Sequence, residues 1–343
     1  MKLYEYAVRR IFLLIFVLFG VTLITFYLSR VVLNPLGAYV TERTKPELIP
    51  VIEKRLGLDK PFYIQYLIYL EDLFTLNWGW SRVAHMPVIE ALFYRFPATT
   101  ELAILSFILS LAIGVPLGIL SALKNNKLID HLIRIIALAG ISIPVFWLAL
   151  TLQYSLSYLP KINGLPSLPS SGRVDSILMQ NYPVVRITGL MILDSLLQGN
   201  LVVAWDSFIH LILPSITLAF LNIGVITRVT RSSMLEVIRQ DYITTARAYG
   251  LPERIVIYKY ALKNAIIPVA TLAGLMFGGL LGGAVITETI FAFPGMGQLV
   301  VFAISSNDSY TIMAFTVLAS IIYVMINLAV DILYAWLDPR VKY

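Results

Sequence analysis

The chain contains no cysteine in its 343 residues. Disulfide bonds, thiolate ligands for zinc and a cysteine nucleophile are therefore excluded. Histidine is also scarce, and His85, His131 and His210 are too far apart in the predicted topology to indicate a metal site. The catalytic signatures His-Glu-x-x-His and Gly-x-Ser-x-Gly do not occur. We therefore expect neither a cofactor nor catalysis by this chain alone.

Charge is the second scarcity. Only 13% of the residues are charged, whereas soluble domains carry about 25%. The hydrophobic fraction is 58% and the mean hydropathy is +0.81. This composition indicates a protein embedded in a membrane. The net charge of +6 is then expected to lie beside anionic lipid headgroups, and a nucleic-acid partner is not expected.

Long apolar runs replace the missing charge. A membrane-spanning helix needs about 20 apolar residues, because each residue rises about 1.5 Å and the hydrocarbon layer is about 30 Å thick. Six runs free of Asp, Glu, Lys and Arg meet this need: Ile11–Ser29, Leu102–Leu123, Ile135–Pro160, Ser207–Thr227, Asn264–Thr287 and Ser309–Val330. The sequence therefore predicts an all-α membrane protein with six transmembrane helices. The first run lacks an Ala-x-Ala cleavage pattern after it, so we interpret it as an uncleaved anchor.

The distribution of Lys and Arg predicts the orientation. Residues 187–205 are apolar at both ends, but Asp194, Gln198 and Asn200 in their middle argue against a seventh span. With six spans, segments 1–10, 124–134, 228–263 and 338–343 lie on one side and hold 15 of the 26 Lys and Arg residues in 63 positions. Cytoplasmic loops are enriched in these residues. We therefore expect a multi-pass protein of the cytoplasmic membrane with both termini in the cytoplasm.

The loop 34–97 is too long to be a simple connector. Asp59-Lys60-Pro61 is typical of a helix start, and Pro87 is expected to begin a second short amphipathic helix. We expect a folded extracytoplasmic segment that either caps the bundle or receives an outside partner. The chain is thus divided into an N-terminal anchor with this segment (1–97) and a core of five transmembrane helices (98–343). Turn-forming residues fill much of the other long outside loop, 161–206.

The loop 228–263 is the most informative segment. Gly250 suits the position after a helix end, and Pro252 suits the first turn of the next helix, so two short helices are predicted. Asp241 is the expected N-cap of the first helix, whose small side chains would let another surface approach closely. A basic amphipathic pair lying on the inner leaflet is the alternative. Tethering at both ends to membrane spans disfavours a DNA-binding helix-turn-helix.

The residues of this loop carry a resemblance. Thr244-Thr245-Ala246-x-x-x-Gly250 resembles the Glu-Ala-Ala-x-x-x-Gly motif of the cytoplasmic loop in ABC importer permeases, and the surrounding text resembles the dipeptide/oligopeptide permease subfamily. Two threonines replace the Glu and the first Ala, Lys263 stands at the later Pro of the motif, and Tyr260 stands where many relatives have His. The likeness also covers segments 56–61, 95–99, 282–285, 288–291, 294–297 and 337–340.

The resemblance implies a type I ABC importer permease whose short loop helix contacts a cytoplasmic ATPase. The residues implied in that contact are Asp241, Thr244, Thr245, Ala246, Arg247, Ala248, Tyr249, Gly250, Leu251 and Pro252. A second homologous permease subunit, two ABC ATPase subunits and an extracytoplasmic solute-binding protein are the implied partners. No Gly-Lys dipeptide, and hence no phosphate-binding Gly-x-x-x-x-Gly-Lys-Ser/Thr loop, occurs in the chain. ATP is therefore expected to be hydrolysed by another polypeptide.

A second group of candidate residues lies toward the outer end of the fifth run. Small residues usually mark close helix packing in membranes, but backbone around the glycines could also line a conduit. Glu288 is expected either to cap a hydrated turn or to act at membrane depth. The candidate conduit residues are Gly278, Gly279, Gly282, Gly283 and Glu288. Gly114 and Gly118 form a second small-residue pair, around Pro116.

Three functions are compatible with this sequence. The first is a permease subunit of a binding-protein-dependent ABC importer for peptides, with oligosaccharides as the second choice of solute, working by ATP-driven alternating access. The second is an ion-coupled secondary transporter, although charge-free span centres count against it. The third is a membrane scaffold without a conduit. Identifying the solute from the sequence alone is not possible, because specificity is expected to lie largely in the binding protein.

Overall fold

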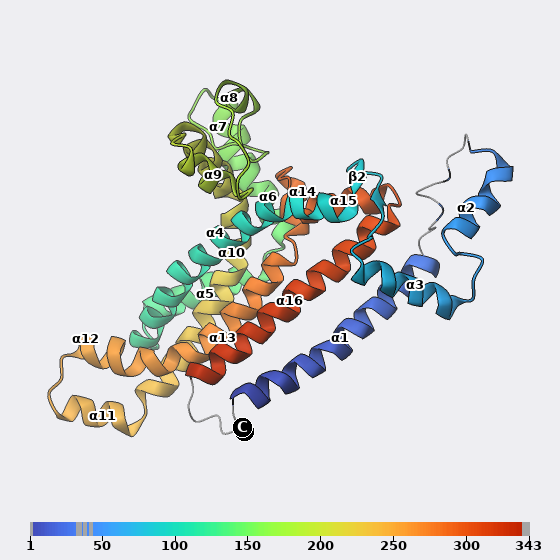
Figure 1. The fold of residues 1–343 in the computed structure, drawn as a ribbon. Helices are drawn as coiled ribbons and strands as arrows, with labels where there is room; N and C mark the ends of the chain where they lie inside the picture. Colours follow the sequence, from blue (N-terminus) through green and yellow to red (C-terminus); the bar gives the residue numbers. More distant parts are fainter. Residues whose placement is uncertain (1–2, 32–35, 37–39, 41–43, 338–343) are drawn as a thin grey trace.

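The computed structural model describes residues 3–31, 36, 40 and 44–337 of the chain. Helices account for nearly all of the regular structure, in agreement with the predicted all-α class (Figure 1). The elements in chain order are α1 (Leu3–Val31), η2 (Pro46–Leu48), α2 (Ile49–Arg55), α3 (Phe62–Phe74), β1 (Trp80–Ser81), β2 (Met86–Pro87), α4 (Val88–Leu123), α5 (Leu128–Ser142), α6 (Val145–Gln153), η3 (Tyr154–Tyr158), α7 (Leu159–Ile162), α8 (Ser176–Asn181), α9 (Met191–Leu197), α10 (Leu201–Ile238), α11 (Asp241–Ala248), α12 (Glu253–Ile255), η4 (Val256–Ala261), α13 (Leu262–Leu281), α14 (Val285–Ile290), α15 (Met296–Ser305) and α16 (Ser309–Leu337).

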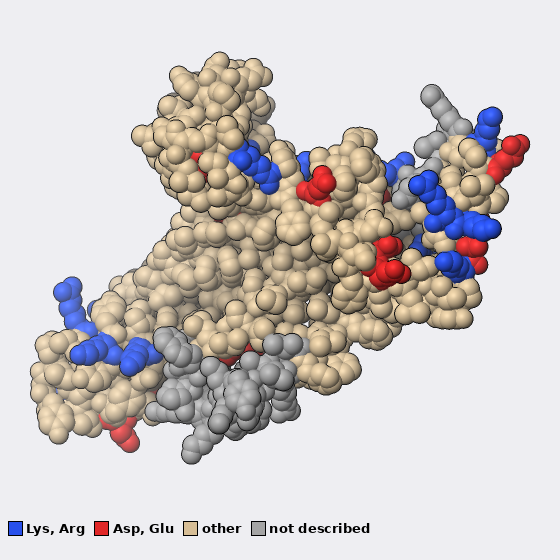
Figure 2. Space-filling view, in the orientation of Figure 1, with Lys and Arg blue, Asp and Glu red and all other residues tan. Residues whose placement is uncertain are grey.

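Five helices in the described part of the chain are long and apolar enough to cross a membrane, and a bent pair makes the sixth span. The unbroken spans are Phe12–Arg30, Val88–Leu123, Leu201–Ile238, Glu253–Leu281 and Ser309–Leu333. The charged side chains gather at the two ends of the visible face in Figure 2, and the band between them is largely free of charge. This arrangement fits a bundle whose middle lies in hydrocarbon.

The third span differs from the straight helix that the run Ile135–Pro160 predicts. The helix ends at Ser142, resumes at Val145 and is bent by 100° between Leu128–Ser142 and Val145–Ile162. Pro144 supplies the reason, because the residue before a proline is pushed out of the helical region. Ile143 accordingly has φ −75° and ψ 124°. The expectation of one straight helix over this run was wrong.

Close approach of two helices forms the centre of the bundle, where α4 packs along α10. A Cβ atom on Gly114 would lie 2.9 Å from Ile226 Cγ2, and one on Gly118 would lie 2.8 Å from the Thr227 carbonyl oxygen. Thr227 also donates its hydroxyl to the Gly114 carbonyl at 3.2 Å. The close-packing interpretation of this glycine pair is therefore confirmed. The helix α4 continues past Pro116 without a break.

The segment after α1 is folded, as predicted. The helix α3 begins after Pro61, and Pro87 precedes a helix start, but that helix is the 36-residue α4 and not a short separate one. One carboxylate, on Asp308, joins the turn between β1 and β2 to the start of α16. It accepts hydrogen bonds from Ser81 Oγ at 3.0 Å, from the Arg82 amide at 2.8 Å and from Thr311 Oγ1 at 2.8 Å.

The stretch 187–205 does not form a span of its own. It contains the short helix α9 and the beginning of α10, as the polar residues at its centre predict. Asp194 is fully buried there and accepts hydrogen bonds from the amides of Ile187 and Gly189 and from the Thr188 amide and hydroxyl. Arg173 ties the preceding loop to α4 through an ion pair with Glu101 at 2.5 Å. The elements α7, α8 and α9 thus stand together at one end of the molecule (Figure 1).

Candidate functional site

The helix α11 projects from the end of the bundle opposite to α8 and α9 (Figure 1). It lies between the end of α10 and the start of α12, and α12, η4 and α13 together form one helical stretch from Glu253 to Leu281. The predicted second short helix of loop 228–263 is therefore the beginning of the fifth span. Likewise α10 extends to Ile238, so the loop is shorter than the 36 residues expected.

The turn after α11 has the geometry that the sequence predicts. Gly250 has φ +72°, and its amide donates to the Arg247 carbonyl at 2.9 Å. The Leu251 amide donates to the Ala246 carbonyl at 3.4 Å, which completes the hydrogen-bond pattern of a Schellman motif. Two predicted positions are shifted by one residue. The N-cap of α11 is Gln240 and not Asp241, and Pro252 is the N-cap of α12 and not a residue of its first turn. A bidentate ion pair from Arg247 to Glu253, at 2.7 and 3.2 Å, spans the turn.

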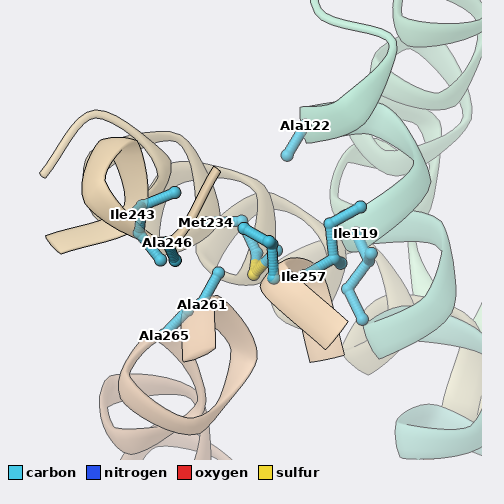
Figure 3. Packing of buried hydrophobic residues seen from close by; sticks show 9 residues of the cluster. Ile119, Ala122, Met234, Ile243, Ala246, Ile257, Ala261 and Ala265 are labelled. Carbon is cyan, nitrogen blue, oxygen red and sulfur yellow. The ribbon is translucent and has the colours of Figure 1, made fainter. Parts of the chain in front are cut away.

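The inner face of α11 packs against α10 and η4, in a buried cluster that extends to α4 and α13 (Figure 3). Ile243 is fully buried and Ala246 is 6% exposed. These two side chains join a cluster formed by the α4 residues Ile119 and Ala122, the α10 residue Met234, the η4 residues Val256, Ile257 and Ala261, and the α13 residue Ala265. Figure 3 shows Ile243 and Ala246 on the side of α11 that faces Met234 and Ala261. A displacement of α11 therefore acts directly on α10 and η4, and through the cluster residues on α4 and α13.

The outer face of α11 carries the exposed residues. Thr244, Thr245, Arg247 and Ala248 are exposed, and the side chain of Tyr249 at the C-cap is 82% exposed. The sequence predicts small side chains on an exposed face, and this is correct for Thr244, Thr245 and Ala248. It is wrong for Ala246, because its Cβ is directed toward the cluster with Met234. The large exposed side chain of Tyr249 was not recognised as a feature of this face.

A buried ion pair stabilises the same end of the bundle. The Asp130 side chain is fully buried and accepts hydrogen bonds from Arg231 Nε at 2.7 Å, Arg231 Nη2 at 2.9 Å and Ser121 Oγ at 2.5 Å. The Asn126 amide also donates to it, at 2.9 Å. These contacts join α4, α5 and α10 to one another. Sequence reasoning missed the pair, since its members lie 101 positions apart.

The second group of candidate residues separates into three environments. Gly278 is buried against α16, where a Cβ would lie 3.2 Å from Ile326 Cγ2. Gly279 has open space beside it, and Gly282 and Gly283 lie at the end of α13, where Gly283 adopts φ +115°. Glu288 is fully buried and does not line the same open space.

The surroundings of Glu288 explain its burial. Its carboxylate accepts hydrogen bonds from Thr99 Oγ1 at 2.8 Å and from the Gln298 amide at 3.0 Å, and the Thr99 hydroxyl accepts one from the Met296 amide at 2.9 Å. Burial raises the pKa of Glu288, and these hydrogen bonds act in the opposite direction. Glu288 therefore caps a turn, as one alternative predicted, but the expected hydration is wrong because the carboxylate is buried. The carboxylate holds the α14–α15 turn against α4.

No group of three or more His, Asp or Glu side chains that could hold a metal ion is found within the described residues.

Comparisons with known proteins identify the family of this chain. The sequence model of the family described as "Binding-protein-dependent transport system inner membrane component" matches residues 114–343, and its N-terminal counterpart matches residues 3–103. The chain is 43% identical over 339 residues to the dipeptide transport system permease protein DppB of Alkalihalophilus pseudofirmus, covering 98% of this chain and 99% of the relative. It is 46% identical over 329 residues to the probable D,D-dipeptide transport system permease protein DdpB of Escherichia coli, covering 96% and 94%.

A solved structure shares the fold. The MetNI methionine ABC transporter in an inward-facing conformation matches with a TM-score of 0.51 at 17% identity, over 74% of this chain and 98% of the matched chain. This likeness confirms the type I permease architecture. The family match also favours the importer over the ion-coupled transporter and the scaffold. The chain belongs to the family of binding-protein-dependent transport system inner membrane components, and it is a multi-pass permease subunit of an ABC importer.

Proposed function

We propose that the chain conducts short peptides into the cell as half of a transmembrane conduit opened and closed by ATP-driven alternating access. The choice of solute is supported by the relatives, which are named as dipeptide, D,D-dipeptide and di/tripeptide permeases at 40–46% identity. Oligosaccharides are the competing solute. The mechanism is supported by the packing of α11.

The helix α11 is the proposed contact with a partner ATPase. Its outer face, with Thr244, Thr245, Arg247, Ala248 and Tyr249, meets the ATPase, while Asp241 and the Gly250-Leu251-Pro252 turn set its angle. Ala246 acts from the inside, through the buried cluster. The single observation that carries this proposal is that Ile243 and Ala246 pack on α10 and η4 in a buried cluster that also contains residues of α4 and α13. Closure of two ATPases would therefore move α10 and the start of the fifth span directly, and α4 through the residues of this cluster.

The proposed assembly contains a second homologous permease subunit, two ATPase subunits and an extracytoplasmic solute-binding protein. Six spans form half of a conduit, and the absence of a nucleotide-binding Gly-Lys motif requires an ATPase on another chain. The Lys and Arg distribution supports an orientation with α11 and both termini in the cytoplasm. The end of the molecule with α8 and α9 then faces the binding protein.

The glycine stretch at the end of α13 is the proposed conduit surface. Gly279 is exposed with open space beside it, and Gly282 and Gly283 continue this stretch toward α14. We assign Gly278 to the packing that fixes α13 on α16, and Glu288 to the packing that fixes α14 beside the conduit. Residues 1–97 are proposed as an N-terminal anchor and outer segment, and residues 98–343 as the permease core.

Reconstitution tests the proposed function. The chain, its companion permease, both ATPases and the binding protein are placed in liposomes, and uptake of a labelled dipeptide and a labelled oligosaccharide is compared with and without ATP. ATP-dependent uptake of the dipeptide alone is expected. Uptake of only the oligosaccharide would reject the solute, and uptake by the isolated chain under an ion gradient would reject the mechanism.

A further inference from the structure

A cavity lies at the C-terminal end of α1, on the side of the molecule opposite to α11. Its volume is about 450 Å³. Its walls are the last residues of α1, the α2–α3 turn, one face of α3, residues 77–79 and the first turns of α16. The first span ends at Arg30, so the cavity lies where the bundle leaves the hydrocarbon layer. It is remote from α11 (Figure 1).

The charge of the lining is strongly positive. Arg30, Lys54, Arg55 and Lys60 line the cavity, and Asp72 is the carboxylate among the lining residues. In the described part of the chain, no carboxylate lies within ion-pair distance of any of the four cations. Lys and Arg side chains, with Asp and Glu side chains among them, also gather at this end of the molecule in Figure 2. Four cations around one enclosed space repel one another, and an anion between them would remove this repulsion.

Two buried donors in the lining have no partner among the described residues. They are Nε of Arg30 and the hydroxyl of Tyr69, whose side chain is only 9% exposed. Buried polar atoms are nearly always hydrogen-bonded, so each unpartnered atom indicates a missing acceptor. Burial raises the pKa of Tyr69, so the hydroxyl stays a donor at neutral pH. A guanidinium and a phenol that face the same cavity suit the oxygens of a phosphate group.

The surroundings of the cavity favour a lipid over a free phosphate. Below Arg30, the α1 side chains Ile24 and Tyr27 are 61% and 52% exposed, and Leu67 on α3 is 60% exposed. Ile24 and Tyr27 belong to the first span, so their exposed surfaces lie on the membrane side of the cavity, where acyl chains would run. Rings of Phe26, Phe62 and Tyr66 fill the space between α1 and α3, and Phe26 stacks on the lining residue Tyr69.

We propose that this cavity binds the phosphate headgroup of an anionic phospholipid, held by Arg30, Tyr69 and the cations of the α2–α3 turn. The bound lipid fills the space between α1, α3 and α16 and joins the N-terminal anchor to the core. Asp72 opposes the headgroup charge and limits the affinity. This site is independent of the transported solute and of the ATPase contact.

Native mass spectrometry of the purified full-length chain tests the site. Retention of dioleoyl phosphatidylglycerol is compared with that of dioleoyl phosphatidylcholine, which has the same acyl chains but no net charge. We expect preferential retention of the anionic lipid by the wild-type protein. The double variant Arg30→Gln/Arg55→Gln should lose this preference, whereas Lys124→Gln/Lys127→Gln, which removes two exposed cations at the other end of the bundle, should keep it.

Two single variants keep the test decisive if the double variant fails to fold. Tyr69→Phe removes only the hydroxyl and should lower retention of the anionic lipid about tenfold, because a hydrogen bond to a charged group is lost. Asp72→Asn should increase retention. Equal retention of both lipids by the wild-type protein, or unchanged retention in Tyr69→Phe and Asp72→Asn, would overturn the proposal. Displacement of the lipid by a large excess of inorganic phosphate would show that the occupant is a free anion.

Discussion

Replacement of Gly250 is the sharpest test of how α11 acts. Its φ of +72° lies in the left-handed region, which costs a residue with a side chain about 1–2 kcal/mol. No heavy atom lies within 4 Å of the position that a Cβ would occupy, so the substitution strains the backbone without a clash. A helix of eight residues has little stability of its own, so its position depends on this turn and on the buried cluster.

The expected loss of solute uptake follows from the backbone strain at position 250. A cost of about 1–2 kcal/mol lowers the population of the native turn by about 5- to 30-fold relative to a relaxed turn. Gly250→Ala should therefore reduce solute uptake partially, and Gly250→Val should nearly abolish it, because a β-branched residue is disfavoured further at positive φ. The assembled complex should keep its ATPase activity, since this chain does not hydrolyse ATP. Uptake and ATP hydrolysis are measured on the same reconstituted samples.

Gly164 provides a matched control at the other end of the molecule. It has φ +66° with no heavy atom within 4 Å of a Cβ, and its turn has the same pair of hydrogen bonds, from Gly164 to Lys161 and from Leu165 to Pro160. Gly164→Val carries the same backbone cost but should leave coupling intact. Wild-type uptake in Gly250→Val, or an equal loss in Gly164→Val, would refute the role of the α11 turn.

Three further predictions concern separate parts of the chain. A single cysteine at Tyr249, which is 82% exposed, should crosslink to the partner ATPase, whereas one at the buried Ala246 should not; the reverse result would place the wrong face of α11 against the partner. Arg231→Met should lower the stability in detergent by about 3 kcal/mol, because it removes the hydrogen-bonded cation of the buried Asp130 carboxylate and leaves only Arg134, at 3.7 Å. The double variant with Asp130→Asn should recover part of the loss, and no change in melting temperature would contradict this. Burial alone would raise the pKa of Asp194, but hydrogen bonds from the neighbouring loop hold this pKa below its ordinary value. The protection of residues 186–200 against hydrogen exchange, relative to the intrinsic rate at each pH, should therefore stay high at neutral pH and fall only as the pH drops below about 3.9 and through the lower folded-state pKa. Asp194→Asn should accelerate this exchange at neutral pH.

Local signals in the sequence predicted much of the fold. Apolar run lengths identified the six spans, and glycine and proline identified the ends of elements at Pro61, Pro87 and Gly250. The bend at Pro144 was missed because the apolar run continues through it, and run length alone does not distinguish a straight span from a broken one. The extensions of α4 and α10 beyond the membrane were missed for the related reason that charged residues do not end a helix.

The candidate site was predicted in position but not in orientation. The motif identified the segment of α11, yet the burial of Ala246 depends on Met234 and on η4, which no local pattern relates to it. The Asp130–Arg231 and Glu288–Thr99 pairs join positions 101 and 189 apart in the chain, so only the fold brings them together. Single charged residues near span ends gave no signal that distinguished these pairs from hydrated side chains.

The Asp308 carboxylate couples the β1–β2 turn to the last span. It caps the first turn of α16 through Thr311 and at the same time holds Ser81 and the amide of Arg82 in the β1–β2 turn. Any rotation of α16 must carry this turn with it or break charged hydrogen bonds inside a dry site. A protein that prefers one position of the turn would by reciprocity shift the span toward one orientation. Binding of a protein at the β1–β2 turn is thereby coupled to the orientation of α16 within the membrane.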